Sequence, residues 1–237
     1  MLKVALLNIL PTYFKNKLRN INNAIFHKKK KSVLIENYFK TDFPKKALIS
    51  YITEPFVSGI AQKHTNHLEC HKIAMCLHKL GFSVDVVDFD NKNIIIDYQK
   101  YQLIFGFGDV LEKAFYHIDP KKTTTIYYGT GNHYFFINPA SINRLQEVYE
   151  KTGVLMLKSV RFAESMWTLQ TTLSTGLIVL GNSFTANTFQ KYYLKGQVKP
   201  IPASFHQLHT PDLENIDFET EKNIFCGLVA MVLYTKG

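Results

Sequence analysis

Cysteine is scarce in this sequence, and long apolar runs are absent from it. Three cysteines, Cys70, Cys76 and Cys226, occur among 237 residues without the spacing of a disulfide framework, which favours reduced thiols and a cytoplasmic setting. No stretch reaches the roughly 20 apolar residues that a transmembrane helix requires. The first residues, MLKVALLNILPTYF, lack the small-residue cleavage site of a signal peptide. The composition therefore argues against a disulfide-stapled secreted scaffold and against a helical membrane protein.

Complete nucleotide-binding and metal-binding signatures are also missing. The segments GFGDV and GTGNH each contain Gly-x-Gly, but neither completes Gly-x-Gly-x-x-Gly or lies in the first βα turn. No Gly-x-x-x-x-Gly-Lys-Ser/Thr phosphate loop occurs. His67 and His71 are four residues apart, but no third ligand is fixed by spacing, so two exposed histidines explain the pattern better than a metal site. We therefore expect no metal and no bound cofactor.

The basic residues are concentrated at the amino-terminal end. Residues 1–46 hold eleven Lys and Arg against two acidic residues, a difference that equals the whole net charge of +9. Such an arm is attracted to polyanions, either anionic lipid headgroups or nucleic acid, although a solvated extension is the simpler alternative. The remaining residues are neutral in sum and carry no nucleic-acid-binding signature. An anionic membrane surface is therefore the expected partner of residues 1–46, and nucleic acid is disfavoured.

After the arm, strand and helix patterns alternate. KKALISYI predicts a buried strand, HTNHLECHKIAMCLHKLG a helix that begins with a capping box of Asn66 and Glu69, and SVDVVDF a second strand. The apolar stripe of this helix is expected at Ile73, Cys76, Leu77 and Leu80. A strand–helix–strand unit of this length implies parallel strands.

The same alternation continues to about residue 205. YQLIFGFG, TTTIYYGTGNH, GLIVLG and QVKPIPASF predict further strands, while NPASINRLQEVYEKTG, SVRFAESMWTLQTTLSTG and SFTANTFQKYYLKG predict helices. The fold class is α/β, a Rossmann-like doubly wound and mainly parallel sheet. Three regions follow: a basic extension over 1–45, the α/β domain over 46–205, and a hinge with an apolar tail over 206–237.

Polar and glycine-rich turns follow four of the predicted strands. The turns are TEPFVSG, GFGD, GTGNH and GNSFT, and ligands of open α/β sheets bind beyond the carboxyl ends of the strands. His133 in GTGNH could act as an acid or base near neutral pH, or be a turn histidine in water. Gly181, Asn182 and Ser183 open a helix whose positive end suits an anion, although capping by Ser183 also explains them. A polar crevice is therefore predicted, unless these glycines only permit tight turns.

The order of these segments resembles a known family. ISYITEPF, HTNHLECHKIAMCLHKLGFSVDVVDFDN, YQLIFGFGD, YYGTGNH and LIVLGNSFTANTF together resemble the N-terminal half of two-domain (GT-B) glycosyltransferases of the family 4 kind, over residues 46–206. In that family the N-terminal domain binds the acceptor, and the C-terminal domain binds the nucleotide-sugar. The resemblance implies a transferase of polysaccharide biosynthesis that holds a glycan or lipid-linked acceptor, with a nucleotide-sugar as donor substrate.

The resemblance also implies roles for individual residues. His133 is the expected catalytic residue, in a turn that faces the site of sugar transfer. The acceptor-binding residues that it implies are His64, Asn66, Gly129, Gly131 and Asn132. Gly181, Asn182 and Ser183 are expected to face the cleft and its phosphates. The alternative function is a non-catalytic Rossmann-like ligand-binding domain with a polyanion-binding arm.

The tail suggests a reason for the missing second half. Ile224–Tyr234 is apolar but too short to span a bilayer. If the codons of this segment are translated in the reading frame two bases further on, they permit a glycine-containing segment. That segment resembles the first strand and loop of the second domain of the family. The hypothesis is that a one-base slip near Phe225 has replaced that domain with an out-of-frame tail. The 237-residue product is then expected to have no transfer activity alone, whether it is cytoplasmic or peripheral on the inner face of the membrane.

Overall fold

The computed structural model describes residues 33–60, 65–163 and 168–204. Most of the basic extension, His64 and the tail over 206–237 lie outside these residues, so the predictions made for them stay predictions.

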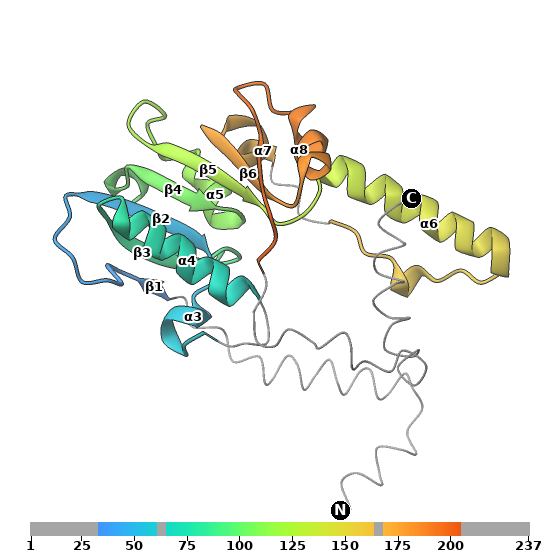
Figure 1. Ribbon diagram of the computed structural model, residues 1–237, viewed down its shortest axis with the longest axis horizontal. Coiled ribbons are helices and arrows are strands. Elements are labelled where there is room, and N and C mark those ends of the chain that lie inside the picture. Colours follow the sequence, from blue (N-terminus) through green and yellow to red (C-terminus); the bar gives the residue numbers. More distant parts are fainter. Residues whose placement is uncertain (1–32, 61–64, 164–167, 205–237) are drawn as a thin grey trace, which may run out of the picture. The chain divides into compact units, whose positions relative to one another are not determined.

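A single sheet organises the described part of the chain (Figure 1). Its strands are β1 (Leu34–Ile35), β2 (Lys45–Tyr51), β3 (Phe82–Asp88), β4 (Leu103–Gly106), β5 (Thr124–Gly129), β6 (Gly176–Leu180) and β7 (Lys199–Ile201). Their order is β1-β3-β2-β4-β5-β6-β7, and all neighbours are parallel except β1, which is antiparallel to β3. The predicted α/β class with a mainly parallel sheet is confirmed.

Helices cover both faces of this sheet. They are α3 (Glu54–Val57), α4 (Thr65–Lys79), α5 (Asp109–Ala114), α6 (Tyr134–Thr152), α7 (Thr168–Leu173) and α8 (Ser183–Gln190), with 3-10 turns η1 (Tyr98–Lys100) and η2 (Leu157–Ser159). α4 lies across one face, as Figure 1 shows, and packs on alternate residues of β2 such as Ala47 and Ile49. The residue between them, Leu48, packs with α5 on the opposite face. This alternation of side chains along a strand is what allows two helical layers on one sheet.

The helices differ from the prediction in several places. The stripe of α4 that faces the sheet contains Cys70, Ala74 and Leu77, whereas Cys76 and Leu80 are exposed. Asn66 lies within α4 and is already helical, which a capping residue is not, so the predicted capping box is wrong. The carboxylate of its supposed partner, Glu69, instead accepts hydrogen bonds from Tyr51 and Tyr128.

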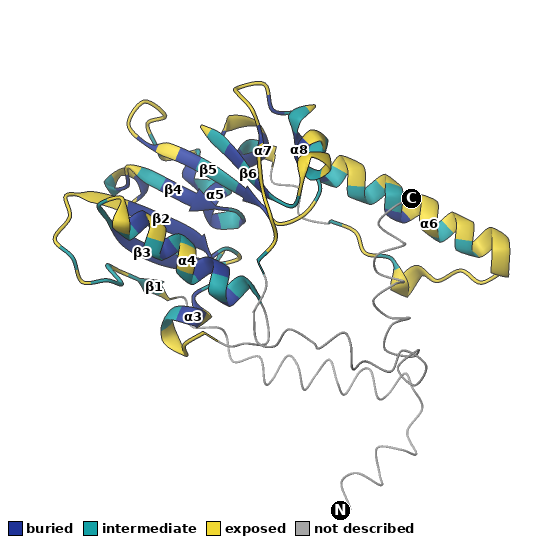
Figure 2. Cartoon of the chain, viewed as in Figure 1, coloured by how far each residue is buried: buried dark blue, intermediate teal, exposed yellow. Residues whose placement is uncertain are grey.

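Two other helices also need correction. Of the helix predicted across 159–176, the described residues include α7, whereas residues 160–163 form an irregular segment that hydrogen-bonds to α6. α6 begins at Tyr134, four residues earlier than predicted, and buries only Ser141 (Figure 2). α5 is a helix that the sequence prediction missed.

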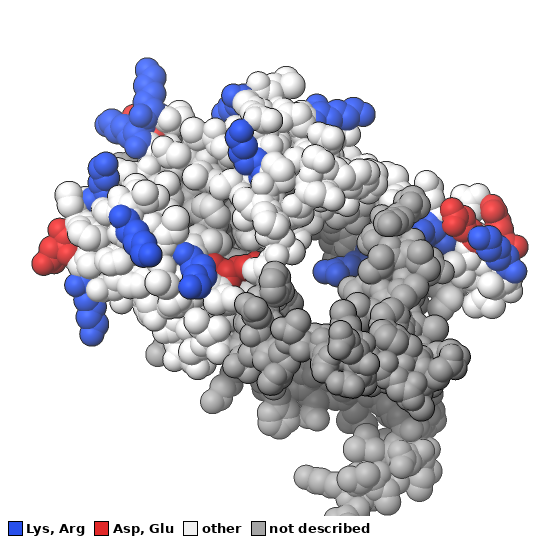
Figure 3. All heavy atoms as spheres, in the orientation of Figure 1, with Lys and Arg blue, Asp and Glu red and all other residues white. Residues whose placement is uncertain are grey.

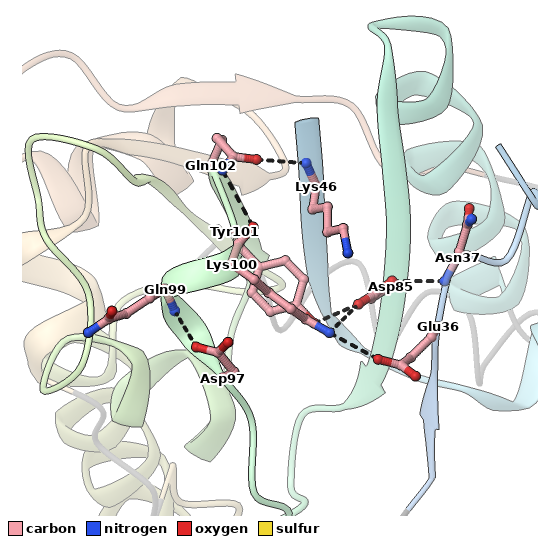
Figure 4. Close-up of polar contacts among 9 residues, drawn as sticks. All are labelled: Glu36, Asn37, Lys46, Asp85, Asp97, Gln99, Lys100, Tyr101 and Gln102. Carbon is pink, nitrogen blue, oxygen red and sulfur yellow. Dashed lines mark hydrogen bonds and ion pairs between the residues drawn. The ribbon is translucent and has the colours of Figure 1, made fainter. Parts of the chain in front are cut away.

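A buried carboxylate fixes the start of the domain. Asp85 of β3 accepts hydrogen bonds from the Tyr101 hydroxyl at 2.7 Å and the Asn37 backbone amide at 2.8 Å (Figure 4). The Lys100 ammonium lies 3.2 Å from Asp85 and 3.0 Å from Glu36. Burial, together with Asp85, raises the pKa of the Tyr101 hydroxyl, which keeps it a donor. This network attaches residues 36–37 to the sheet, so the folded unit includes residues that the prediction assigned to the extension.

Candidate functional site

The order of the parallel strands reverses direction between β2 and β4. Open α/β sheets usually bind ligands at such a point, but here it is closed. A Cβ atom on Gly106 would lie 2.0 Å from the Ser50 carbonyl oxygen, and one on Gly108 would lie 2.4 Å from that of Phe89. The side chain of Gln170, which is fully buried, donates to the Gly108 carbonyl and accepts from its amide, both at 2.9 Å. The GFGD turn is therefore packed against protein atoms, and the amide and carbonyl of Gly108 are already bonded.

A second buried polar group lies beside this point. The Glu69 carboxylate accepts hydrogen bonds from the hydroxyls of Tyr51 and Tyr128 at 3.3 Å and of Ser204 at 2.5 Å. Burial, with the nearby carboxylate as a further cause, raises the pKa of both tyrosines. Hydroxyl donors satisfy the hydrogen-bonding capacity of this carboxylate. The cluster therefore connects α4 to the ends of β2 and β5 and to Ser204, which follows β7.

The turn after β5 has a different construction. His133 caps α6: its Nδ1 atom accepts a hydrogen bond from the Phe135 amide at 3.2 Å, and its own amide donates to the Thr188 hydroxyl at 3.0 Å. Its ring stacks on Tyr192 with centroids 4.4 Å apart and meets Phe189 edge-on. The residue is 1% exposed, and burial lowers its pKa to about 4. The imidazole is thus neutral at physiological pH and is enclosed by aromatic rings.

A cavity of about 590 Å³ opens over the same turn. Its lining in the described residues combines backbone and polar groups of the turn with aromatic rings and one guanidinium. The residues are Tyr127, Thr130, Gly131, Asn132, Tyr134, Ile137, Arg161, Phe162, Ala163 and Phe189. No acidic residue of the described ranges is among them. The volume lies within the range of small-molecule sites, which combine apolar walls with a few polar groups.

The far wall of the cavity is held in place by α6. Asn138 makes two hydrogen bonds with the backbone of Ala163, at 2.9 and 3.2 Å, and the Ser141 hydroxyl donates to the Arg161 carbonyl at 3.0 Å. The Arg161 guanidinium has no hydrogen bond or ion pair with a described residue. The backbone of residues 161–163 is therefore fixed, while the Arg161 side chain remains available to a ligand.

The predicted site residues are only partly brought together. Gly131 and Asn132 line the cavity, and nothing lies within 4 Å of a Cβ built on Gly131. Gly129 does not line the cavity, and a Cβ built on it would be 3.0 Å from the Val179 side chain. His133 does not line the cavity, and Asn66 lies on α4. His133 was expected to face the transfer site, but it is buried instead. The reason is that its side chain caps α6.

The turn after β6 does not line this cavity. The prediction that Ser183 caps α8 is wrong: Asn182 is the cap, and its side chain accepts from the amides of Phe184 and Thr185 at 3.0 and 3.3 Å. Gly181 has a φ of 136° and would bring a Cβ to 2.6 Å from the Thr185 hydroxyl. These contacts explain Gly181 and Asn182 through the turn itself, since the Asn182 side chain already accepts from two amides that an anion would need.

Sequence reasoning missed the arginine of this site. Arg161 was assigned to a helix, and a signal was present, because Arg19, Arg144 and Arg161 are the only arginines among 28 basic residues. His67, expected on an exposed helix face, is instead buried, 3.8 Å from Glu54. Within the described ranges, no group of three or more His, Cys, Asp or Glu residues is placed to hold a metal ion.

Comparison with known proteins gives no relative. No family model, curated protein or solved structure matches the chain.

In the part of the chain that the structure describes, no helix combines the length and apolarity needed to cross a membrane. On the face of the molecule in Figure 3, the lysines and arginines of the described residues are scattered rather than gathered into one patch.

Proposed function

We propose that this chain is the acceptor-side domain of a glycosyltransferase and that it binds a glycan acceptor in the cavity over the GTGNH turn. The observation that carries the proposal is the lining of this cavity, where Asn132 and Arg161 lie among the rings of Tyr127, Tyr134 and Phe162. The cavity lies at the carboxyl end of β5, the side of the sheet at which α/β proteins bind ligands.

The chemistry of a sugar suits this lining. A pyranose ring has apolar C–H faces that pack on aromatic side chains and hydroxyls that need directional partners. Tyr134 and Phe162 offer ring surface, and the side chains of Asn132 and Thr130 offer donors and acceptors. The fixed backbone of residues 161–163 means that little of this wall has to be ordered on binding.

The closed point between β2 and β4 also favours an acceptor over a nucleotide at this sheet. Gly108, whose amide would have to face a phosphate, is buried and bonded to Gln170. The family resemblance implies that the contacts to the nucleotide-sugar come from a second domain. We therefore expect glycan binding by this chain without steady release of nucleoside diphosphate from nucleotide-sugars.

The test is isothermal titration of the full chain with a panel of neutral oligosaccharides. Asn132→Ala removes a polar group from the cavity, and Asn143→Ala, on an exposed turn of α6 that does not line it, is the matched control. We expect Asn132→Ala to weaken binding about tenfold, the loss of one or two hydrogen bonds, and Asn143→Ala to leave it unchanged. A folded chain that binds no member of the panel contradicts the proposal. Binding of nucleotides or polyanions instead supports a non-catalytic ligand-binding domain.

A further inference from the structure

A second, smaller cavity adjoins the first along α6. It has a volume of about 230 Å³ and lies between α6 and the segment that returns from it. Arg144 and Ser141 line it from α6, and Ser159 and Arg161 line it from the returning segment. Because Arg161 lines both cavities, the two are neighbours that share this residue.

Two arginines line this cavity, and neither forms an ion pair with a described residue. Arg144 contacts Ser141 at 3.4 Å, and no described carboxylate forms an ion pair with Arg144 or Arg161. Glu150, on the same helix, accepts a hydrogen bond from Gln146 instead. No acidic residue of the described ranges lines the cavity. A space whose described lining carries charge of one sign has a positive potential, which favours an anionic ligand.

The choice of arginine adds to this argument. Of the 28 basic residues in the chain only three are arginines, and two of those three line this one small space. Arginine presents planar, paired N–H donors that match the oxygens of phosphate, whereas lysine is the usual residue elsewhere on this protein. The Ser159 hydroxyl supplies a further hydrogen-bonding group, whereas the Ser141 hydroxyl already donates to the Arg161 carbonyl.

We infer that Arg144 and Arg161 bind the phosphate of a phosphorylated sugar whose sugar ring occupies the larger cavity. The two guanidinium groups and the Ser159 hydroxyl offer more donors than the two oxygens of a carboxylate can accept, and they suit the three terminal oxygens of a phosphate monoester. The placement of the sugar rests on the proposed function, whereas the phosphate site rests on the two arginines alone.

The experiment is titration of the full chain with inorganic phosphate, a hexose 1-phosphate and the matching neutral hexose. Arg144→Gln and Arg161→Gln each remove one charge, and Lys158→Gln removes the same charge from an exposed neighbour that lines neither cavity. We expect each arginine variant to lose about tenfold in affinity for the hexose phosphate, the effect of a charge-assisted hydrogen bond. Lys158→Gln should change it less than twofold. The basic arm is common to all samples, so its contribution cancels.

The outcomes separate this inference from the proposed function. Arg144 does not line the larger cavity, so Arg144→Gln should leave binding of the neutral hexose unchanged. Phosphate binding that depends on both arginines supports the site even if neutral sugars fail to bind, which would contradict only the glycan proposal. Equal affinities of all three variants for the hexose phosphate overturn the site, provided that circular dichroism shows them folded.

A further arm identifies the source of the phosphate. Val154, Leu155, Met156 and Leu157, which lead into the site, are 47–63% exposed, so a phosphate attached to a lipid is a second possible source. Binding to phosphatidylcholine vesicles with and without phosphatidic acid is measured for the double arginine variant and for wild type. Loss of phosphatidic acid binding in the double variant assigns the same site to a lipid phosphate. If the double variant loses binding of the soluble hexose phosphate but keeps binding of phosphatidic acid, the result supports a phosphorylated sugar as the ligand.

Discussion

The two Gly-x-Gly turns of this protein are nearly indistinguishable in sequence and opposite in structure. In GFGD, Gly106 and Gly108 have φ values of 131° and 95° and touch neighbouring backbone, so both glycines are required by packing. In GTGNH, a Cβ on Gly131 would meet nothing within 4 Å, and the turn borders a cavity. Gly-x-Gly after a strand therefore marks tight packing against neighbouring backbone in one turn and an open cavity border in the other. The neighbouring segments of the fold decide which of the two occurs.

Gly106→Ala should have the largest effect on stability. The new methyl would overlap the Ser50 carbonyl at 2.0 Å and would hold a non-glycine residue at a φ of 131°, so β2 and β4 would have to separate. We expect a loss of about 4 kcal/mol or more in the free energy of unfolding, measured by urea denaturation. A variant as stable as wild type would show that the GFGD turn is not closed.

The pH dependence of stability tests the enclosure of His133. Its pKa is about 4 in the fold and about 6.5 in an unfolded chain. Between these values this imidazole binds more protons in the unfolded chain, so the contribution of His133 to stability falls by about 3 kcal/mol as the pH is lowered from 6.5 to 4 and is constant below.

The matched variant for this measurement is His133→Asn, which keeps a capping side chain but cannot titrate. We expect its stability relative to wild type to improve by about 3 kcal/mol from pH 7 to pH 4. His117→Asn, at an exposed histidine, is the control. Parallel pH profiles for wild type and His133→Asn would mean that solvent reaches the imidazole and would restore His133 as a candidate catalytic group.

Gln170→Leu should have a smaller effect on the closed turn. Leucine fills a similar volume but leaves the buried Gly108 amide without its partner, while the Gly108 carbonyl retains its bond from the Glu112 amide. One unsatisfied buried donor costs about 2 kcal/mol, measurable by chemical denaturation. If stability is unchanged, Gln170 does not hold the turn.

Gly131→Ala should have the smallest effect. The added methyl enters open space, so we expect a change below about 0.5 kcal/mol in the free energy of unfolding. Together with Gly106→Ala this forms a matched pair: the same substitution in two turns of the same sequence type. Similar destabilisation by both variants would remove the distinction between the turns.

The sequence predicted the layered fold because the relevant signals are local. Buried apolar strands followed by glycine turns recur along the chain, and β2 and β3 were located to within a residue. β1 and α5 were missed because two and six residues give too little periodicity to detect. The irregular residues 160–163 were predicted as helix because a local pattern does not reveal their partners. These partners are Asn138 and Ser141 on α6, which lie 20 or more positions earlier in the chain.

The site was predictable only in outline. The turn after β5 was located correctly, and Gly131 and Asn132 do line its cavity. The burial of His133 depends on Phe189 and Tyr192, which follow a different strand. The presence of Arg144 and Arg161 in the lining of one cavity depends on the return of the chain along α6. Such long-range packing leaves no local pattern in the sequence.

The most direct test of the open turn as a ligand site is saccharide affinity in a Gly131→Leu variant, measured by titration calorimetry beside wild type. The leucine side chain would occupy space at the edge of the cavity, where a Cβ has no neighbour within 4 Å. We predict at least a tenfold loss of affinity for the saccharide that wild type binds, without loss of thermal stability. Unchanged affinity in a folded variant would contradict the assignment of this cavity as the glycan-binding site.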